Sequence, residues 1–258
     1  MKDLEAWAAS PCRTPLIVGG ARQVGKTWLL KEFGRTHYDA VAHIAFHDNE
    51  VMKRAFDGTL NPDRLLTAIG TYTSTNPTDG RTLVFLDDIQ ECPRAITSLK
   101  VFCEDRPDVP VVAAGSLLGT AQNRSTKSDE RISWLAGKVD YLDIHPMTFT
   151  EFLMALGEGH YADLLKIESL GDACAMSEHY DDLLKLYFYV GGMPEAVQAY
   201  CDNHLLEESR KVQLRLLKNY ERDISENART AISADRIWEA WQSVPLQLFR
   251  KTGNGKFM

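Results

Sequence analysis

The chain has 258 residues, of which 44% are hydrophobic and 25% are charged. This is the composition of an ordinary globular protein of one or two domains, and it excludes a disordered, fibrous or collagen-like chain. The formal net charge of −7 excludes a general attraction to nucleic acid or anionic membranes, so such a partner would need a local basic patch.

The cysteines and the apolar runs bear on the cellular compartment. Cysteine stands at five scattered positions without a C-x-x-C pair, namely Cys12, Cys92, Cys103, Cys174 and Cys201. This pattern predicts reduced thiols rather than a disulfide framework or a zinc site. No apolar run approaches the roughly 20 residues needed to span a bilayer, and the first residues lack the apolar core of a secretory signal. We therefore expect a cytoplasmic protein without a membrane partner.

Short apolar runs alternate with helical patterns in the first half of the chain. Five runs predict strands: TPLIVGG, AVAHIAFHD, RTLVFLDD, DVPVVAAGS and KVDYLDIHP. Helical patterns lie between them at 26–35, 62–72 and 93–105, and the second of these has Asn61 as an N-cap and Pro62 at its first position. Strands spaced by helices predict an α/β fold, with a parallel sheet covered on both faces.

The character of the sequence changes after Pro146, because the patterns that follow have the helical period and none predicts a strand. A helical subdomain is therefore expected to follow the sheet. The polar stretches at 73–80 and 122–131 predict surface loops.

The segment LIVGGARQVGKTWLL, residues 16–30, contains the pattern G-x-x-x-x-G-K-[ST]. It follows an apolar strand and leads into a helix, as a phosphate-binding loop requires, whereas a plain glycine turn with a solvated lysine explains the context less well. Glycines there permit backbone angles that let successive N–H groups surround a phosphate at the positive end of the helix. Lys26 would reach the terminal phosphates, Thr27 would bind Mg²⁺, and Arg22 would contact the nucleotide or an acidic neighbour. The expected nucleotide contacts are Gly20, Ala21, Arg22, Gln23, Val24, Gly25, Lys26, Thr27 and Trp28.

A phosphate loop predicts an acidic partner, and the run RTLVFLDDIQ supplies one. Its apolar strand ends in Asp87 and Asp88. A carboxylate at the tip of a buried strand can hold Mg²⁺ beside Thr27, and we assign that role to Asp87. Asp88 would lie near the γ-phosphate and polarise an attacking water. The alternative is that the pair serves as a turn and N-cap for the next helix.

Five separated blocks resemble, in order and spacing, a family of prokaryotic AAA+-like ATPases related to the signal-transduction (STAND) branch: GGARQVGKTWLL, LVFLDDIQ, VVAAGSLLG, LAGKVDYLDIHPMTFTEFL and YVGGMPEAVQAY. In that family an AAA_14 ATPase domain precedes a domain of unknown function, DUF4143. The resemblance implies a P-loop ATPase core at 1–147, a helical lid at 148–232, and the start of a truncated, winged-helix-like segment at 233–258. It also implies ATP or ADP as the ligand and Ser116 as a sensor of the γ-phosphate, although a serine that starts a turn remains the alternative.

The chain departs from this family at two positions. Asp88 stands where the family usually has the longer Glu, and a misplacement of about 1 Å can cost roughly a hundredfold in rate, so we expect slow hydrolysis. Lys138 stands where many relatives have Arg. A lysine cannot form a bidentate guanidinium contact, so we do not expect a catalytic finger there.

A basic stripe follows one face of the helix expected near 205–224. Its four members fall within about 60° of arc at 100° per residue, namely Lys211, Arg215, Lys218 and Arg222. A solvated face is one interpretation, supported by glutamates nearby. The other is contact with nucleic-acid phosphates or with the nucleotide of a neighbouring subunit in an oligomer, where Arg222 would be the trans-acting arginine.

Two further patterns bear on a functional role, namely a glycine–proline turn and a pair of histidines. The turn GGMPEA, residues 191–196, is either a hinge close to the nucleotide or a turn that only connects two helices. His43 and His47 are four residues apart on a strand-like segment, where that spacing is not the face-sharing spacing of a helix, and we expect both to be structural.

The sequence favours an Mg²⁺-dependent AAA+-like ATPase in which ATP and ADP hold the core and the lid in different relations. The alternative is a nucleotide-gated docking module with little turnover. A small-molecule kinase is a third hypothesis, and it is weaker because the chain lacks an arginine-rich lid.

Overall fold

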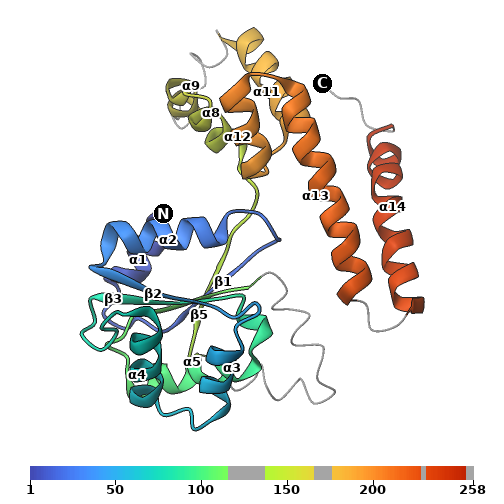
Figure 1. The fold of residues 1–258 in the computed structure, drawn as a ribbon. Coiled ribbons are helices and arrows are strands. Elements are labelled where there is room, and N and C mark those ends of the chain that lie inside the picture. Colours follow the sequence, from blue (N-terminus) through green and yellow to red (C-terminus); the bar gives the residue numbers. More distant parts are fainter. Residues whose placement is uncertain (116–136, 166–175, 228–230, 254–258) are drawn as a thin grey trace. The chain divides into compact units, whose positions relative to one another are not determined.

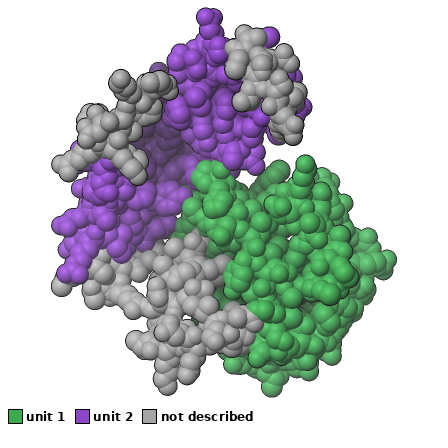
Figure 2. Space-filling view, turned by 180° about the vertical axis from the view of Figure 1, so that it is seen from behind, with its two compact units in different colours: residues 1–146 green, residues 147–258 purple. Residues whose placement is uncertain are grey.

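The computed structural model describes residues 1–115, 137–165, 176–227 and 231–253, with side chains omitted near the ends of the last two helices. The chain divides into two compact units, unit 1 (Met1–Pro146) and unit 2 (Met147–Met258), as Figure 2 shows. Ser116, Cys174 and the polar stretch 122–131 lie outside the described residues.

Unit 1 is built on a five-stranded sheet with the strand order β2-β3-β4-β1-β5. Every pairing in it is parallel. The strands are β1 (Leu16–Gly19), β2 (Ala40–Ala45), β3 (Thr82–Asp87), β4 (Val111–Ala114) and β5 (Asp140–Asp143). The predicted strands and the predicted α/β fold class with a parallel sheet are therefore confirmed.

Helices cover both faces of this sheet, so unit 1 has three layers (Figure 1). Residues that alternate along β3 face opposite layers: Phe85 belongs to the cluster formed with the first two helices, and Leu86 to the cluster formed with the next three. A strand buried on both faces has no polar side, which explains its uninterrupted apolar run. The helices are α1 (Lys2–Ala9), α2 (Lys26–His37), α3 (Glu50–Asp57), α4 (Pro62–Thr73) and α5 (Pro93–Asp105).

The start of α4 follows the sequence prediction. The Oδ1 atom of Asn61 accepts a hydrogen bond from the backbone N–H of Arg64 at 3.0 Å, and Pro62 occupies the first turn. Helix α3, which the sequence did not predict, begins in the same way, because Oδ1 of Asn49 accepts from the N–H of Met52 at 3.1 Å. Its eight residues are too few to show a clear helical period.

All described elements of unit 2 are helices, as predicted after Pro146. They are α8 (Phe149–Ala155), α9 (Gly159–Leu164), α11 (Ser177–Val190), α12 (Pro194–Asn203), α13 (Leu206–Asn227) and α14 (Ala231–Gly253). Helix α8 opens with a capping box between Thr148 and Glu151. Phe152, Val190 and Val197 form a buried cluster that joins α8, α11 and α12. Among the helices described, none combines the length and the apolar content that crossing a bilayer demands.

Candidate functional site

The loop between β1 and α2 has a backbone that requires glycine. Gly20 has φ +134°, and a Cβ on it would lie 2.2 Å from the carbonyl oxygen of Ile144, just beyond β5. Gly25 has φ +91° and is the N-cap of α2. Both conformations lie where glycine has no steric cost, and at Gly20 the close approach of a second backbone adds to the requirement. This loop, residues 20–27, therefore presents its backbone at the amino end of a 12-residue helix.

Lys26 is buried, with 8% of its surface exposed. Its Nζ atom donates hydrogen bonds to the carbonyl oxygens of Gly20 at 2.9 Å and Ala21 at 2.6 Å. Burial lowers the pKa of this ammonium group, while the negative charges of Asp87 and Asp88 act in the opposite direction. The lysine of the loop and the two acids of β3 thus share one electrostatic environment.

Asp87 is the last residue of β3 and has 6% of its surface exposed. Its Oδ1 atom accepts from the N–H of Asp88 at 3.1 Å, and its backbone carbonyl accepts from the N–H of Phe46 at 3.0 Å. Strand β4 lies between β1 and β3. Because all of these strands are parallel, Asp87 and the loop both follow carboxyl ends, at the edge of the sheet where ligands bind in open α/β folds.

Asp88 has the left-handed conformation, with φ +51°. It is the N-cap of the short 3₁₀ helix η1 (Ile89–Glu91), but its side chain makes no capping hydrogen bond. Instead its Oδ1 atom accepts from Nε2 of Gln90 at 3.2 Å. Asp occupies this backbone region several-fold more readily than most residues, which gives a physical reason for Asp at a position where the family usually has Glu.

His43 also belongs to this site, although the sequence interpretation treated it as structural. Its Nε2 atom lies 3.4 Å from Oδ2 of Asp87, and its ring packs on that of Phe85 with centroids 4.7 Å apart. The sequence missed this contact because the contact depends on β2 and β3 being neighbours. The available signal was a histidine near the carboxyl end of β2, at the level of the residue that precedes the acidic end of β3 by two positions.

The structure places the remaining predicted contacts as follows. Thr27 is the second residue of α2 and is partly exposed, and Trp28 beside it has 69% of its surface exposed. The charge of Arg22 contributes to lowering the pKa of Lys26. Lys138 forms an ion pair with Glu104 at 3.1 Å.

The basic stripe of α13 is exposed, but acidic neighbours accompany part of it. Nζ of Lys211 lies 2.6 Å from a carboxylate oxygen of Glu208, and Arg215 forms an ion pair with Glu195 of α12. These partners offset two of the positive charges. This arrangement favours a solvated face over a phosphate-binding surface.

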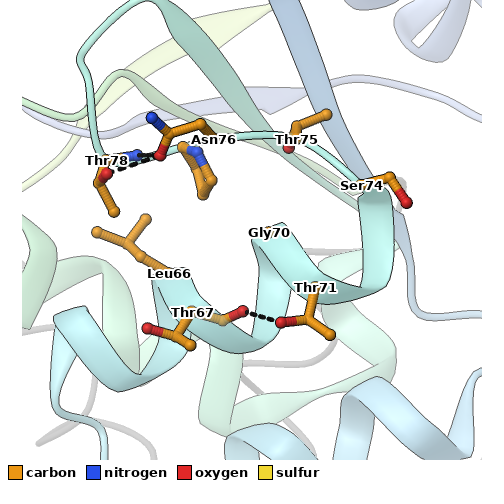
Figure 3. Close-up of a pocket in the computed structure, with 9 residues that line it drawn as sticks. Leu66, Thr67, Gly70, Thr71, Ser74, Thr75, Asn76 and Thr78 are labelled. Carbon is orange, nitrogen blue, oxygen red and sulfur yellow. Dashed lines mark hydrogen bonds between the residues drawn. The ribbon is translucent and has the colours of Figure 1, made fainter.

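The part of unit 1 that the structure describes includes two hollows of similar size. The larger, about 570 Å³, lies beside His43 and is lined by His43, Ala45, His47, Asp48, Asn49, Glu50, Val51 and Tyr72. The smaller, about 430 Å³, lies at the end of α4 (Figure 3). Two of its hydroxyl groups bond within its own wall, since Thr71 donates to the carbonyl of Thr67 and Thr78 donates to Oδ1 of Asn76.

Comparisons with protein families and with curated proteins give the following findings. The family described as AAA domain (AAA_14) matches residues 13–153, and a domain of unknown function (DUF8612) matches residues 181–255. The DUF4143 domain expected from the resemblance is therefore not confirmed. No curated protein matches the sequence.

Solved structures of low similarity include the following three. AMPPCP-bound DnaA from Aquifex aeolicus is 14% identical with a TM-score of 0.45, over 89% of this chain and 67% of that one. The Walker-type ATPase PABY2304 of Pyrococcus abyssi is 17% identical with a TM-score of 0.45, over 88% and 73%. PCH-2 of C. elegans is 15% identical with a TM-score of 0.42, over 84% and 68%.

The match to the AAA domain covers more than half of the chain and includes both the loop at residues 20–27 and the acidic end of β3. The chain belongs to the AAA domain family.

Proposed function

We propose that this protein binds Mg²⁺-ATP, hydrolyses it slowly, and uses the change from ATP to ADP as a conformational switch. The observation that carries the proposal is the buried Lys26, held by loop carbonyls and acted on by the charges of Asp87 and Asp88. A buried ammonium group beside a glycine loop and two carboxylates is suited to a polyanion that arrives with a divalent cation.

Binding would follow from the loop and the first turn of α2. Main-chain N–H groups of the loop would donate to the phosphate oxygens, and the dipole of the helix would favour their negative charge. Lys26 would exchange the carbonyls of Gly20 and Ala21 for phosphate oxygens. Because its ammonium group is already largely removed from water, little further desolvation is needed.

The residues present fit Mg²⁺ by the chemistry of their donors. Thr27 offers a hydroxyl oxygen and Asp87 a carboxylate, and oxygen atoms are the ligands that Mg²⁺ prefers. Together they would hold the ion, whose charge would stabilise the phosphate oxygens during transfer. Asp87 is suited to this because its backbone is held at the end of a buried strand and one oxygen of its carboxylate accepts from the N–H of Asp88.

Hydrolysis would depend on Asp88 as the group that orients and polarises water. Its left-handed backbone and the hydrogen bond from Gln90 hold a short carboxylate in place. A carboxylate set back from the water gives slow turnover. Ser116 would report the state of the γ-phosphate, as the family resemblance implies.

The test compares the full chain with Lys26→Ala. Calorimetry with Mg²⁺-ATP, Mg²⁺-ADP and Mg²⁺-GTP measures affinity and base preference, and phosphate release measures turnover. We expect adenine nucleotides to bind the wild-type protein, and Lys26→Ala to bind them about 10- to 100-fold more weakly, because a hydrogen bond to a charged group contributes about 1.5–3 kcal/mol. No binding by the wild type would overturn the proposal. Binding without phosphate release would favour the docking module, and transfer of labelled phosphate to a metabolite would favour a kinase.

A further inference from the structure

Each carboxylate oxygen of Asp87 has its own nitrogen partner. The backbone N–H of Asp88 donates to Oδ1 at 3.1 Å. On the other side, Nε2 of His43 faces Oδ2 at 3.4 Å. An ionised carboxylate only accepts hydrogen bonds, so a hydrogen bond between the two requires the His43 tautomer with its proton on Nε2. The orientation of Asp87 is therefore set from two directions.

Backbone register and ring packing fix His43 itself. His43 of β2 pairs with Phe85 of β3, and Phe85 lies two residues before Asp87 in the same strand. The two rings lie 31° apart in plane, with centroids at 4.7 Å, and the side chain of His43 has 27% of its surface exposed. A ring held by its neighbour on the adjacent strand loses little entropy when it donates a hydrogen bond, so it is suited to holding another group in place.

We propose that His43 is a positioning residue for the metal-binding carboxylate of Asp87. This inference rests on the proposed Mg²⁺-nucleotide function. Rotation about the last torsion of an aspartate is soft, so one backbone donor alone leaves the carboxylate free to turn. With the second donor from His43, the carboxylate of Asp87 would keep one orientation, and its remaining lone pairs would point in a fixed direction. The ion held together with Thr27 would then bind a ligand that needs no reorientation. Outer partners of this kind typically contribute 10- to 100-fold to metal affinity.

A second histidine at the same hollow provides a matched control. His47 lines that hollow with His43 but is exposed, and its Nε2 atom lies 3.3 Å from a carboxylate oxygen of Asp48 rather than from Asp87. Replacing His47 changes the histidine content and the hollow while leaving the contact with Asp87 intact.

Two variants separate the hydrogen bond of His43 from its packing. His43→Phe keeps an aromatic ring on Phe85 but has no N–H, whereas His43→Gln keeps an N–H donor but has no ring. The measurement is the affinity for ADP, by calorimetry, across a series of Mg²⁺ concentrations and in excess EDTA. Thermal unfolding followed by circular dichroism checks that each variant is folded.

We expect His43→Phe to need about 10- to 100-fold more Mg²⁺ for the metal-dependent gain in ADP affinity, with its affinity in EDTA unchanged. His43→Gln and His47→Phe should remain close to wild type. The inference is overturned if His43→Phe needs no more Mg²⁺ than wild type. It is also overturned if His43→Gln loses as much as His43→Phe, since that result assigns the effect to the ring. If the wild-type protein binds no ADP at any Mg²⁺ concentration, the proposed function fails, and this inference fails with it.

Discussion

The Nζ atom of Lys26 donates to the carbonyl oxygen of Ala21 at 2.6 Å, so the ammonium group of the loop is held by the loop's own backbone. Burial lowers the pKa of this group from its ordinary value of 10.5. The negative charges of bound phosphates would raise that pKa again.

This relationship predicts proton uptake on nucleotide binding at alkaline pH. Between the lowered pKa of free Lys26 and 10.5, the free protein has partly lost the proton and the complex has regained it. Affinity for Mg²⁺-ATP should therefore fall as pH rises through that window. Calorimetry over a series of alkaline pH values, in buffers of different ionisation enthalpy, measures the proton count. Lys26→Arg, whose side chain does not titrate there, should show no uptake from this position; an identical uptake would exclude Lys26 as its source.

Gly20→Ala should destabilise unit 1 strongly. The added Cβ would lie 2.2 Å from the carbonyl oxygen of Ile144, and the backbone at φ +134° disfavours any side chain. We expect a loss of about 2–4 kcal/mol in the free energy of unfolding, measured with urea. Gly80→Ala is the control, because Gly80 also has a positive φ of +71° but its Cβ would lie at an ordinary 3.4 Å from Asp108. Equal losses in the two variants would mean that the approach of Ile144 contributes nothing.

Asp88→Asn should separate binding from hydrolysis. Asn tolerates the left-handed backbone of this position as well as Asp does, so the fold should be retained, while the charge that polarises water is lost. We expect phosphate release to fall by about 100-fold or more, with the affinity for Mg²⁺-ATP unchanged. Asp48→Asn is a suitable control, since Asp48 is also left-handed, at φ +52°. A turnover rate unaffected by Asp88→Asn would exclude this carboxylate from the reaction.

Asn61→Ala should weaken the start of α4. The hydrogen bond from the N–H of Arg64 to the Asn61 side chain is lost, and the N–H is left to water. Removing an N-cap of this kind costs about 1 kcal/mol in the free energy of unfolding. Asn61→Asp retains an acceptor and should stay close to wild type in the same urea titration. If both variants lose the same amount, the cap is not the cause.

Local patterns predicted much of the fold. The five strands were apparent because each is a short apolar run bounded by turn residues, and the start of α4 was apparent because Asn61 and Pro62 form a local cap signal. Helices α1 and α3, of eight residues each, were not predicted. The strand order could not be predicted from the sequence, because the apolar pattern of a strand does not show which other strands pair with it.

Part of the candidate site could also be predicted from local patterns, and part of it could not. The loop and the acidic strand end are contiguous motifs, so Lys26, Asp87 and Asp88 could be named from the sequence. The contact of His43 with Asp87 joins positions 44 residues apart and exists because β2 pairs with β3 in one register. The left-handed backbone of Asp88 was also hidden, because a D-D pair at a strand end is compatible with several turns.

The insertion of β4 between β1 and β3 sets a dimension of the site. The loop at residues 20–27 and the acidic pair lie at the ends of strands that share no hydrogen bonds, and these two strands are held apart by two interstrand spacings, about 10 Å in total. That distance is determined by main-chain geometry rather than by any side chain. Replacing residues along these strands can alter the side chains that would meet at the proposed ion, while the separation of the strands from which those side chains extend stays constant.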